Sequence, residues 1–327
     1  MSTTDTPPAP DAPAAVGIDV GQRFLDAHAD PGGQSKRCAN DRCGRRGLRN
    51  WIQGLGVSRV ALEPTGRYHR NLHQCLAAAG IDVIVVNPRR TRNFARALGQ
   101  EAENDLADAA VLAIFARLGI ARAVAPAPEK LRKLADLVTG RRKLAARKEA
   151  LSKSAAELDE EAASLLRSAI EQDEKLIAEF EARIQAALAA DEGLRRRDES
   201  IRSVPGCGPV TAAALCAGMP ELGSIGPRQA AALAGVAPFD CDSGESAGRR
   251  RIRGGREHPR RALCMAAVSA VRCNPDLKAV YRRLRDDGKK PELALVAVMR
   301  KLVNLLNALL RDDRLWTPAP PPREVPA

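Results

Sequence analysis

The sequence predicts a fold of class α/β plus α, in which an N-terminal α/β domain precedes a wholly helical remainder. Three observations predict it. Between residues 16 and 125, short apolar segments of strand type alternate with helical segments. Residues 129–198 contain no proline and carry leucines at seven-residue spacing. Residues 199–315 are helical in pattern, with two glycine-rich interruptions.

The N-terminal domain begins after a Pro- and Ala-rich leader, residues 1–15, which we expect to be disordered. Its strand-like segments have apolar residues bounded by glycine, proline or asparagine, and its helical segments follow them closely. In chain order we expect strands at 16–20, 24–29 and 36–40, a helix at 48–55, a strand at 59–63, a helix at 69–80, a strand at 81–88, and helices at 92–99 and 105–119. This alternation predicts a mixed sheet covered by helices.

The middle segment, 129–198, has the pattern of a coiled coil. The seam is formed by Leu137, Leu144, Leu151, Leu158 and Leu165, and after a shift of one residue by Leu166, Ile170, Ile177, Phe180 and Ile184. An unbroken helix between Gly140 and Gly193 would span about 80 Å. A hairpin within one chain and a pairing between subunits both fit, and the second predicts a homo-oligomer, a dimer or tetramer.

The C-terminal segment, 199–315, carries two glycine-rich motifs and precedes a Pro-rich tail, 316–327. In the first motif, Gly206 and Gly208 allow a tight turn whose N–H groups approach a phosphate, although an ordinary turn between helices fits as well. The second motif has a turn signal around Ser243. Seven arginines follow it, at Arg249, Arg250, Arg251, Arg253, Arg256, Arg260 and Arg261. This dense cationic loop is typical of a phosphate-binding surface, and Arg141, Arg142 and Lys143 add a second basic cluster.

Four carboxylates interrupt or follow apolar segments of the N-terminal domain. Asp19 and Glu63 stand at the ends of two strand segments, where an unpaired charge is costly to bury. Asp105 and Asp108 are three residues apart and therefore share one helix face. If the helix packs across the sheet, the four carboxylates converge on a site for Mg²⁺ or Mn²⁺, and two such ions about 3.5–4 Å apart suit displacement at phosphorus. Each carboxylate taken alone also fits a surface or capping role.

The charge of the chain indicates a nucleic-acid partner. It has 52 Lys and Arg against 40 Asp and Glu, a net charge of +12 and a pI of about 9.7. We expect no apolar stretch long enough to span a bilayer and no signal peptide, hence no membrane partner. Eight cysteines are scattered without a C-x-x-C pair, which predicts reduced thiols and a cytoplasmic, nucleoid-associated protein.

A zinc site is the alternative use of two histidines. His69 and His73 are four residues apart and share a helix face, as zinc ligands do. No third ligand accompanies them in the sequence. Packing or surface roles are therefore favoured for both, because tetrahedral zinc demands a complete ligand set.

Long, ordered motifs resemble one protein family. The segments GIDVGQRFLDAH and EPTGRYHRNLHQCLAAAGIDVIVVNPRRTRNFARALG, and the D-x-x-D-A pattern at Asp105, resemble the N-terminal domain of the DEDD transposases of the insertion-sequence one-ten family, relatives of the Piv-type DNA invertases. The segments VPGCGPVTAAAL, RQAAALAGVAPFDCDSG, RRRIRGGR and NPDLKAVYRRLRDDGKK resemble the family's C-terminal transposase domain. The resemblance spans nearly the whole chain.

The resemblance implies a fold, a reaction and partners. The N-terminal domain would be a RuvC-like, ribonuclease H-like domain in which Asp19, Glu63, Asp105 and Asp108 bind metal, and Ser243 would be the serine that attacks DNA. Family members are recombinases guided by a structured RNA that pairs with donor and target DNA. The resemblance therefore implies a Mg²⁺-dependent transposase whose partners are DNA and a guide RNA.

Two other functions fit the residues. The same fold would support hydrolysis by a RuvC-type DNA nuclease, with water as the nucleophile and Ser243 as a turn residue. A non-enzymatic nucleic-acid-binding protein would use only the basic loop and the helical turn.

Overall fold

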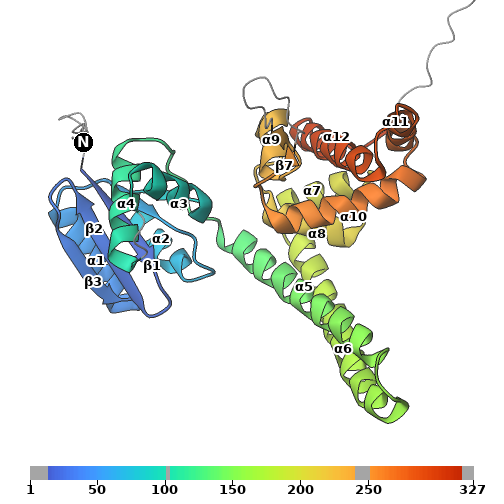
Figure 1. Cartoon of the computed structure of the whole chain (residues 1–327), viewed down its shortest axis with the longest axis horizontal. Helices are drawn as coiled ribbons and strands as arrows, with labels where there is room; N and C mark the ends of the chain where they lie inside the picture. Colours follow the sequence, from blue (N-terminus) through green and yellow to red (C-terminus); the bar gives the residue numbers. More distant parts are fainter. Residues whose placement is uncertain (1–13, 101–103, 240–250, 319–327) are drawn as a thin grey trace, which may run out of the picture. The chain divides into compact units, whose positions relative to one another are not determined.

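The structure, a computed structural model, describes residues 14–100, 104–239 and 251–318. The chain divides into two compact units, residues 1–127 and 128–327, which we describe separately (Figure 1).

The first unit contains a five-stranded mixed sheet in the order β3-β2-β1-β4-β5. Its strands are β1 (Ala15–Val20), β2 (Phe24–Asp30), β3 (Ser35–Ala39), β4 (Arg59–Leu62) and β5 (Asp82–Val85). Its helices are α1 (Arg42–Gly54), α2 (His69–Ala77), α3 (Pro88–Ala97) and α4 (Asp105–Arg117). The first three strands are antiparallel, whereas β4 runs parallel to β1 and β5 parallel to β4. The predicted α/β domain with a mixed sheet is confirmed.

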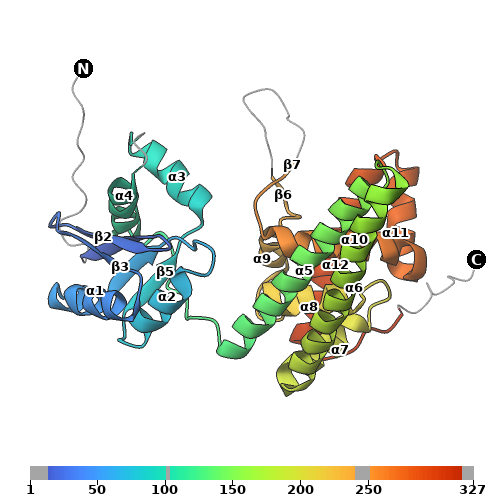
Figure 2. The ribbon, with the colours of Figure 1, turned by 90° about the horizontal axis from the view of Figure 1, so that it is seen from below.

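The two faces of the sheet pack against different helices, as Figure 2 shows. On β1, Val16 and Ile18 face a core formed with α1 and α2. Ala15 belongs instead to the core formed with α4. Because side chains alternate along a strand, Asp19 lies on the α4 face together with Ala15 and Gly17. The alternation of β1 therefore decides which helix Asp19 meets.

Gly17 allows α4 to lie directly on β1. A Cβ atom at Gly17 would stand 2.0 Å from the Ala109 carbonyl oxygen and 2.3 Å from the Ala113 nitrogen. No side chain fits in that space, so glycine is required for the close approach of helix and strand. The far end of α4 is held by an ion pair between the buried Arg117 and Asp30 at the end of β2.

The second unit is almost entirely helical. Its elements are α5 (Glu129–Ala155), α6 (Glu160–Ala189), α7 (Glu192–Arg202), α8 (Pro209–Gly218), α9 (Pro227–Leu233), β6 (Pro238–Phe239), β7 (Arg251–Ile252), α10 (Glu257–Cys273), α11 (Pro275–Asp286) and α12 (Pro291–Arg311). The expected central long helices and helical C-terminal region are thus present, and within this unit they share one hydrophobic core.

The long helices α5 and α6 form an antiparallel hairpin. Arg141 contacts Glu181 at 2.7 Å and Lys148 contacts Glu174 at 2.8 Å, so successive pairs run in opposite chain directions. The chain turns because α5 ends at Ala155 and Asp159 caps α6 by accepting from the Ala162 N–H.

Near the turn of the hairpin, the structure differs from the predicted seam. Leu158 lies in the turn and is 49% exposed, and Leu165 is 73% exposed. The heptad pattern does not continue through these positions because the helix stops before Leu158. At the base, Ile184 is buried with Leu134 and Val138, so the seam there joins the core of the second unit.

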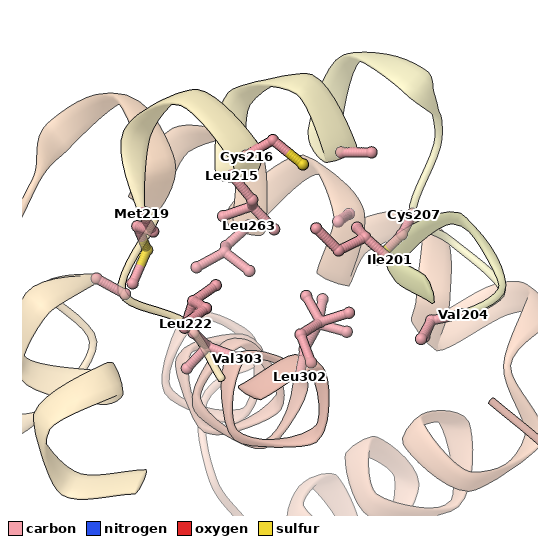
Figure 3. Packing of buried hydrophobic residues seen from close by; sticks show 14 of the residues in the cluster. Ile201, Val204, Cys207, Leu215, Cys216, Met219, Leu222, Leu263, Leu302 and Val303 are labelled. Carbon is pink, nitrogen blue, oxygen red and sulfur yellow. The ribbon is translucent and has the colours of Figure 1, made fainter. Parts of the chain in front are cut away.

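The core of the second unit is built by α7, α8, α10 and α12 (Figure 3). Among the described residues, α12 is long and apolar enough to cross a membrane by length and composition alone, so the expectation of no such stretch is wrong. Burial explains its composition: Val298, Leu302, Val303 and Leu306 are core residues. The buried Asn307 is satisfied by bonds with Gly223 and Ile225.

Candidate active site

Asp19 and Glu63 end two neighbouring parallel strands. Ile18 of β1 is paired with Leu62 of β4, so the residues that follow them stand side by side. Ala61 of β4 packs in the α4 core, and Glu63 shares its face by alternation. Both carboxylates are half-buried, at the carboxyl ends of their strands and beneath the start of α4.

Asp105 and Asp108 lie in the first turn of α4. The helix begins there because the Asn104 side chain accepts from the Ala107 N–H at 2.8 Å. Carboxylates in a first turn are favoured by the positive end of the helix dipole. The fit of α4 over Gly17 then places this turn over the strand ends.

Electrostatic coupling links all four carboxylates. Burial, with the charges of Asp105 and Asp108 and to a smaller extent Glu63, raises the pKa of Asp19 from 3.8 to about 6. Burial, with the charge of Asp108, also raises the pKa of Glu63, against the opposing effects of Thr91 and Arg92. The tetrad predicted from the sequence therefore shares one patch of negative potential.

The sequence analysis missed a fifth carboxylate, Asp26. It lies directly opposite Asp19 in the β1–β2 pairing, on the same face, and is only 8% exposed. Burial, with the charge of Asp105, raises its pKa, although Arg37 at 3.7 Å opposes the shift. The signal was present in the sequence, since Asp26 alternates with the apolar Leu25 and Ala27 along β2. Asp26, Arg37 and Asp105 line a cavity of about 370 Å³ beside the tetrad.

The donor set suits a hard divalent cation. Carboxylate oxygens are the ligands that Mg²⁺ and Mn²⁺ prefer, and the charges of Asp105 and Asp108 contribute to the raised pKa of Asp19 here, as that of Asp108 does for Glu63. The buried Thr91 hydroxyl beside Glu63 has no hydrogen-bond partner of ordinary geometry. Within the described ranges, however, no three His, Cys, Asp or Glu residues form a group that would hold a metal ion. The carboxylates lie on the same face of the sheet, under α4, and interact electrostatically, but they do not form a closed coordination site.

Of the two histidines, His73 has a packing role. His73 is buried on α2 and its Nε2 lies 2.7 Å from the Val124 carbonyl oxygen. Burial lowers the pKa of both His69 and His73. One ring nitrogen of His73 is engaged by the backbone, which supports a packing role for His73.

The second predicted part of the site lies mostly outside the described residues. Ser243, Arg249 and Arg250 fall in the segment 240–250, and only the backbone of Arg251 is described.

The remaining arginines of this motif differ in their engagement. Arg256 forms a two-bond pair with Glu221, at 2.7 and 2.6 Å, and also donates to the Gly218 carbonyl. Arg260 donates to the Gly254 carbonyl at 2.9 Å. Arg261 approaches Glu257 no closer than 3.9 Å, a long ion pair, and its side chain is mostly exposed. Arg256 thus joins two segments of the fold, whereas Arg261 stays accessible to an anion. Arg253 is exposed as well.

The two motif glycines have different structural roles. Gly206 has φ of +102°, and a Cβ there would lie 2.7 Å from Ala270 of α10. Close packing of the turn on α10 therefore explains Gly206. Gly208 is the N-cap of α8 and has open space around it, so its backbone is accessible. The predicted basic cluster of Arg141, Arg142 and Lys143 lies on α5.

Two family models match the chain. A DEDD transposase model of the IS110 type matches residues 16–160, and the model of the transposase IS116/IS110/IS902 family matches residues 198–282. The first match confirms the predicted RuvC-like, ribonuclease H-like fold of the N-terminal domain.

The chain was also compared with solved structures and with curated proteins. The chain is similar to Thermus thermophilus RuvC at 17% identity and a TM-score of 0.26, over 34% of this chain and 99% of that chain. It is also similar to T. thermophilus RuvC in complex with a Holliday junction substrate, at 16% identity and a TM-score of 0.24, over the same shares. No curated protein matches it.

Proposed function

Since this chain belongs to the IS110 family of transposases and carries a DEDD nuclease domain, we propose that it recombines DNA in two chemical steps, using Ser243 as nucleophile and the tetrad as a divalent-metal site. The observation that supports the metal site most is the mutual coupling of the four carboxylates. Asp19 has a pKa raised to about 6 by burial and by the acidic residues of α4. Such a patch favours cations and excludes a bare phosphate.

The tetrad residues have distinct roles in this proposal. Asp19 and Glu63 extend from the sheet and provide fixed ligands, because β1 and β4 are held in register by their neighbours. Asp105 and Asp108 reach the same region from α4. When bound, Mg²⁺ or Mn²⁺ would neutralise phosphate charge and favour ionisation of a nearby hydroxyl. Asp26 and Arg37 border the region and shape the approach of the DNA strand.

Ser243 would supply covalent chemistry. Its Oγ attacks phosphorus, a bond from oxygen to phosphorus forms, and the bond to the departing strand breaks. The proton lost by the serine ends on the released oxygen of that strand, which becomes a hydroxyl. Attack by a second strand hydroxyl reverses these changes, so the energy of the cut bond is kept and rejoining needs no ATP.

The active site is proposed to be composite. Asp19 and its partners belong to the first unit and Ser243 to the second. We therefore expect them to act together in a homo-oligomer, paired through the long helices. Mixing inactive Asp19→Ala and Ser243→Ala proteins should restore strand exchange if the two parts come from different subunits, and no rescue would contradict it.

A guide RNA is the second proposed partner. Family membership and the net charge of +12 support it. The test is binding of the transcript of the element's non-coding flank, compared with an unrelated RNA of equal length and similar fold. Equal affinity for both RNAs would contradict guidance.

Trapping the covalent intermediate tests the reaction. Full-length protein is incubated with Mg²⁺, the RNA and a labelled duplex that carries the element junction, and adducts are separated under denaturing conditions. We expect an adduct that Ser243→Ala abolishes and that the control Ser246→Ala, three residues away, retains. Cleavage that survives Ser243→Ala without an adduct would indicate hydrolysis. Activity without divalent ions, unchanged by Asp105→Asn, would contradict metal-dependent catalysis altogether.

A further inference from the structure

A small cavity lies between α5, α6, α8 and α10, all in the second unit. Its volume is about 170 Å³, and its lining includes Val138, Arg141, Arg142, Ile184, Val210 and His258. This is below the roughly 300–1,000 Å³ of sites for drug-sized molecules, so it accepts one compact group. The cleavage chemistry proposed above uses neither this cavity nor His258, although Arg141 and Arg142 belong to the basic cluster predicted from the sequence.

Cationic groups are part of the lining of the cavity. Arg142 is exposed and has no acidic partner among the described residues. Arg141 lines it too, with its Nε and Nη2 committed to Glu181 at 3.0 and 2.7 Å. Burial first, and then Arg142, Arg261 and Arg141, lowers the pKa of His258, with Glu257 opposing. Among the lining residues Arg141 and Arg142 outnumber the single carboxylate, Glu181, which favours an anion there.

The first turn of α8 also lines the cavity. Pro209 and Val210 line the cavity, and the N-cap residue Gly208 has no side chain to accept from the N–H groups of that turn. These groups and the positive end of the helix dipole support an anion held by Arg142.

Apolar side chains line the cavity as well. Val138 and Ile184 are 6% and 4% exposed, and Ala213 is 3% exposed, so they form a fixed part of its wall. Val210 is 44% exposed, which is unusual for a valine beside a hydrophobic core, and leaves an apolar surface facing the opening. A ligand that suits both the cationic and the apolar lining residues has a phosphate joined to a compact, flat and largely apolar group.

We propose that this cavity binds one unpaired nucleotide of a DNA strand, with its base against Val210, Val138 and Ile184 and its phosphate at Arg142. The proposal rests on the DNA binding of the proposed function, and not on its cleavage chemistry. Arg141 and His258 border the phosphate. DNA is favoured over RNA because the apolar wall suits a deoxyribose, whereas a buried 2′-hydroxyl without a partner would be costly. Extrusion of a base into a pocket is a known device of enzymes that act on DNA.

Two variants test the cavity without disturbing the core. Arg142→Gln removes the unpaired cation from an exposed position. Val210→Asp places an acidic side chain in the first turn of α8, where it stabilises the helix but repels a phosphate. The matched control is Lys143→Gln, which removes an equal charge from the next residue of α5, outside the cavity lining. Thermal unfolding of all three should match the wild type or, for Val210→Asp, exceed it.

The measurement compares the affinity of the full chain for two DNA duplexes of the same sequence, one fully paired and one with a single unpaired thymidine. We expect the unpaired nucleotide to strengthen binding about tenfold. Arg142→Gln and Val210→Asp should abolish this preference, whereas Lys143→Gln should weaken both duplexes equally and keep it. Fluorescence of 2-aminopurine at the unpaired position should change on binding to wild type and not to Val210→Asp.

The outcomes distinguish nucleotide binding in the cavity from the cleavage reaction. Asp19→Asn, which should lose cleavage, should retain the tenfold preference, so failure of the catalytic proposal leaves this result readable. The inference is overturned if wild type shows no preference, if the preference survives both cavity variants, or if an RNA duplex with an unpaired uridine gains as much as the DNA.

Discussion

Replacing Asp19 by asparagine should stabilise the metal-free protein at neutral pH while removing its activity. The pKa of Asp19 is raised from 3.8 to about 6 in the folded chain, chiefly by burial and then by Asp105 and Asp108. Between about pH 4 and pH 6 the folded chain therefore binds a proton that the unfolded chain has lost. The free energy of unfolding falls as pH rises through this window and stays low above it. The difference corresponds to at most about 3 kcal/mol, and solvent screening should reduce it to about 1–2 kcal/mol.

The assay is urea denaturation of the full chain followed by fluorescence. The sequence has two tryptophans, Trp51 in the first unit and Trp316 in the second. A Trp316→Phe background therefore lets Trp51 report on the unit that contains the tetrad. Asp19→Asn should match the parent protein near pH 4 and be about 1–2 kcal/mol more stable at pH 7.5 in a chelating buffer. Equal stability at both pH values, or a loss at pH 7.5, would refute the electrostatic account of the site.

Three further predictions follow from other contacts. Gly17→Ala should destabilise the first unit by about 3 kcal/mol or more and abolish metal binding, because the new Cβ meets the α4 backbone. Urea denaturation followed by Trp51 fluorescence measures this loss of stability, and an unchanged denaturation midpoint would contradict the prediction. Arg256→Ala should lower the free energy of unfolding of the second unit by about 1–2 kcal/mol, because it leaves Glu221 unpaired; thermal unfolding measures this. The control Arg261→Ala should leave stability unchanged and weaken DNA binding. Mg²⁺ should raise the unfolding temperature of the parent protein but not that of Asp108→Asn; equal shifts would place the bound ion elsewhere.

Much of the N-terminal domain could be predicted from the sequence because its information is local. Strand segments such as 16–20 and 59–63 are short apolar runs bounded by glycine and proline, and the structure has strands there. The D-x-x-D spacing placed Asp105 and Asp108 on one helix face without knowledge of any contact. Their coupling to Asp19 then depended on a single question, whether the helix packs across the sheet.

Other features could not be predicted because they depend on tertiary contacts, which the periodicity of the sequence does not reveal. Asp26 joins the acidic patch only because β2 pairs with β1 in the register that sets it opposite Asp19. Leu158 fits the heptad spacing but lies in a turn, because Asp159 begins a new helix. Arg256 belongs to an arginine-rich motif, yet it is held by Glu221, thirty-five residues earlier in the chain. Each of these depends on a partner distant in sequence.

Calorimetric titration with Mn²⁺ tests the central claim most directly, that Asp19, Glu63, Asp105 and Asp108 bind divalent metal together. The full-length protein should bind Mn²⁺ at pH 7.5, and each substitution to asparagine or glutamine within the tetrad should weaken binding by at least about tenfold. The control Asp82→Asn alters an exposed aspartate at the opposite end of the sheet, the start of β5, and should bind as the parent does. Undiminished binding by any two tetrad variants would contradict the shared site.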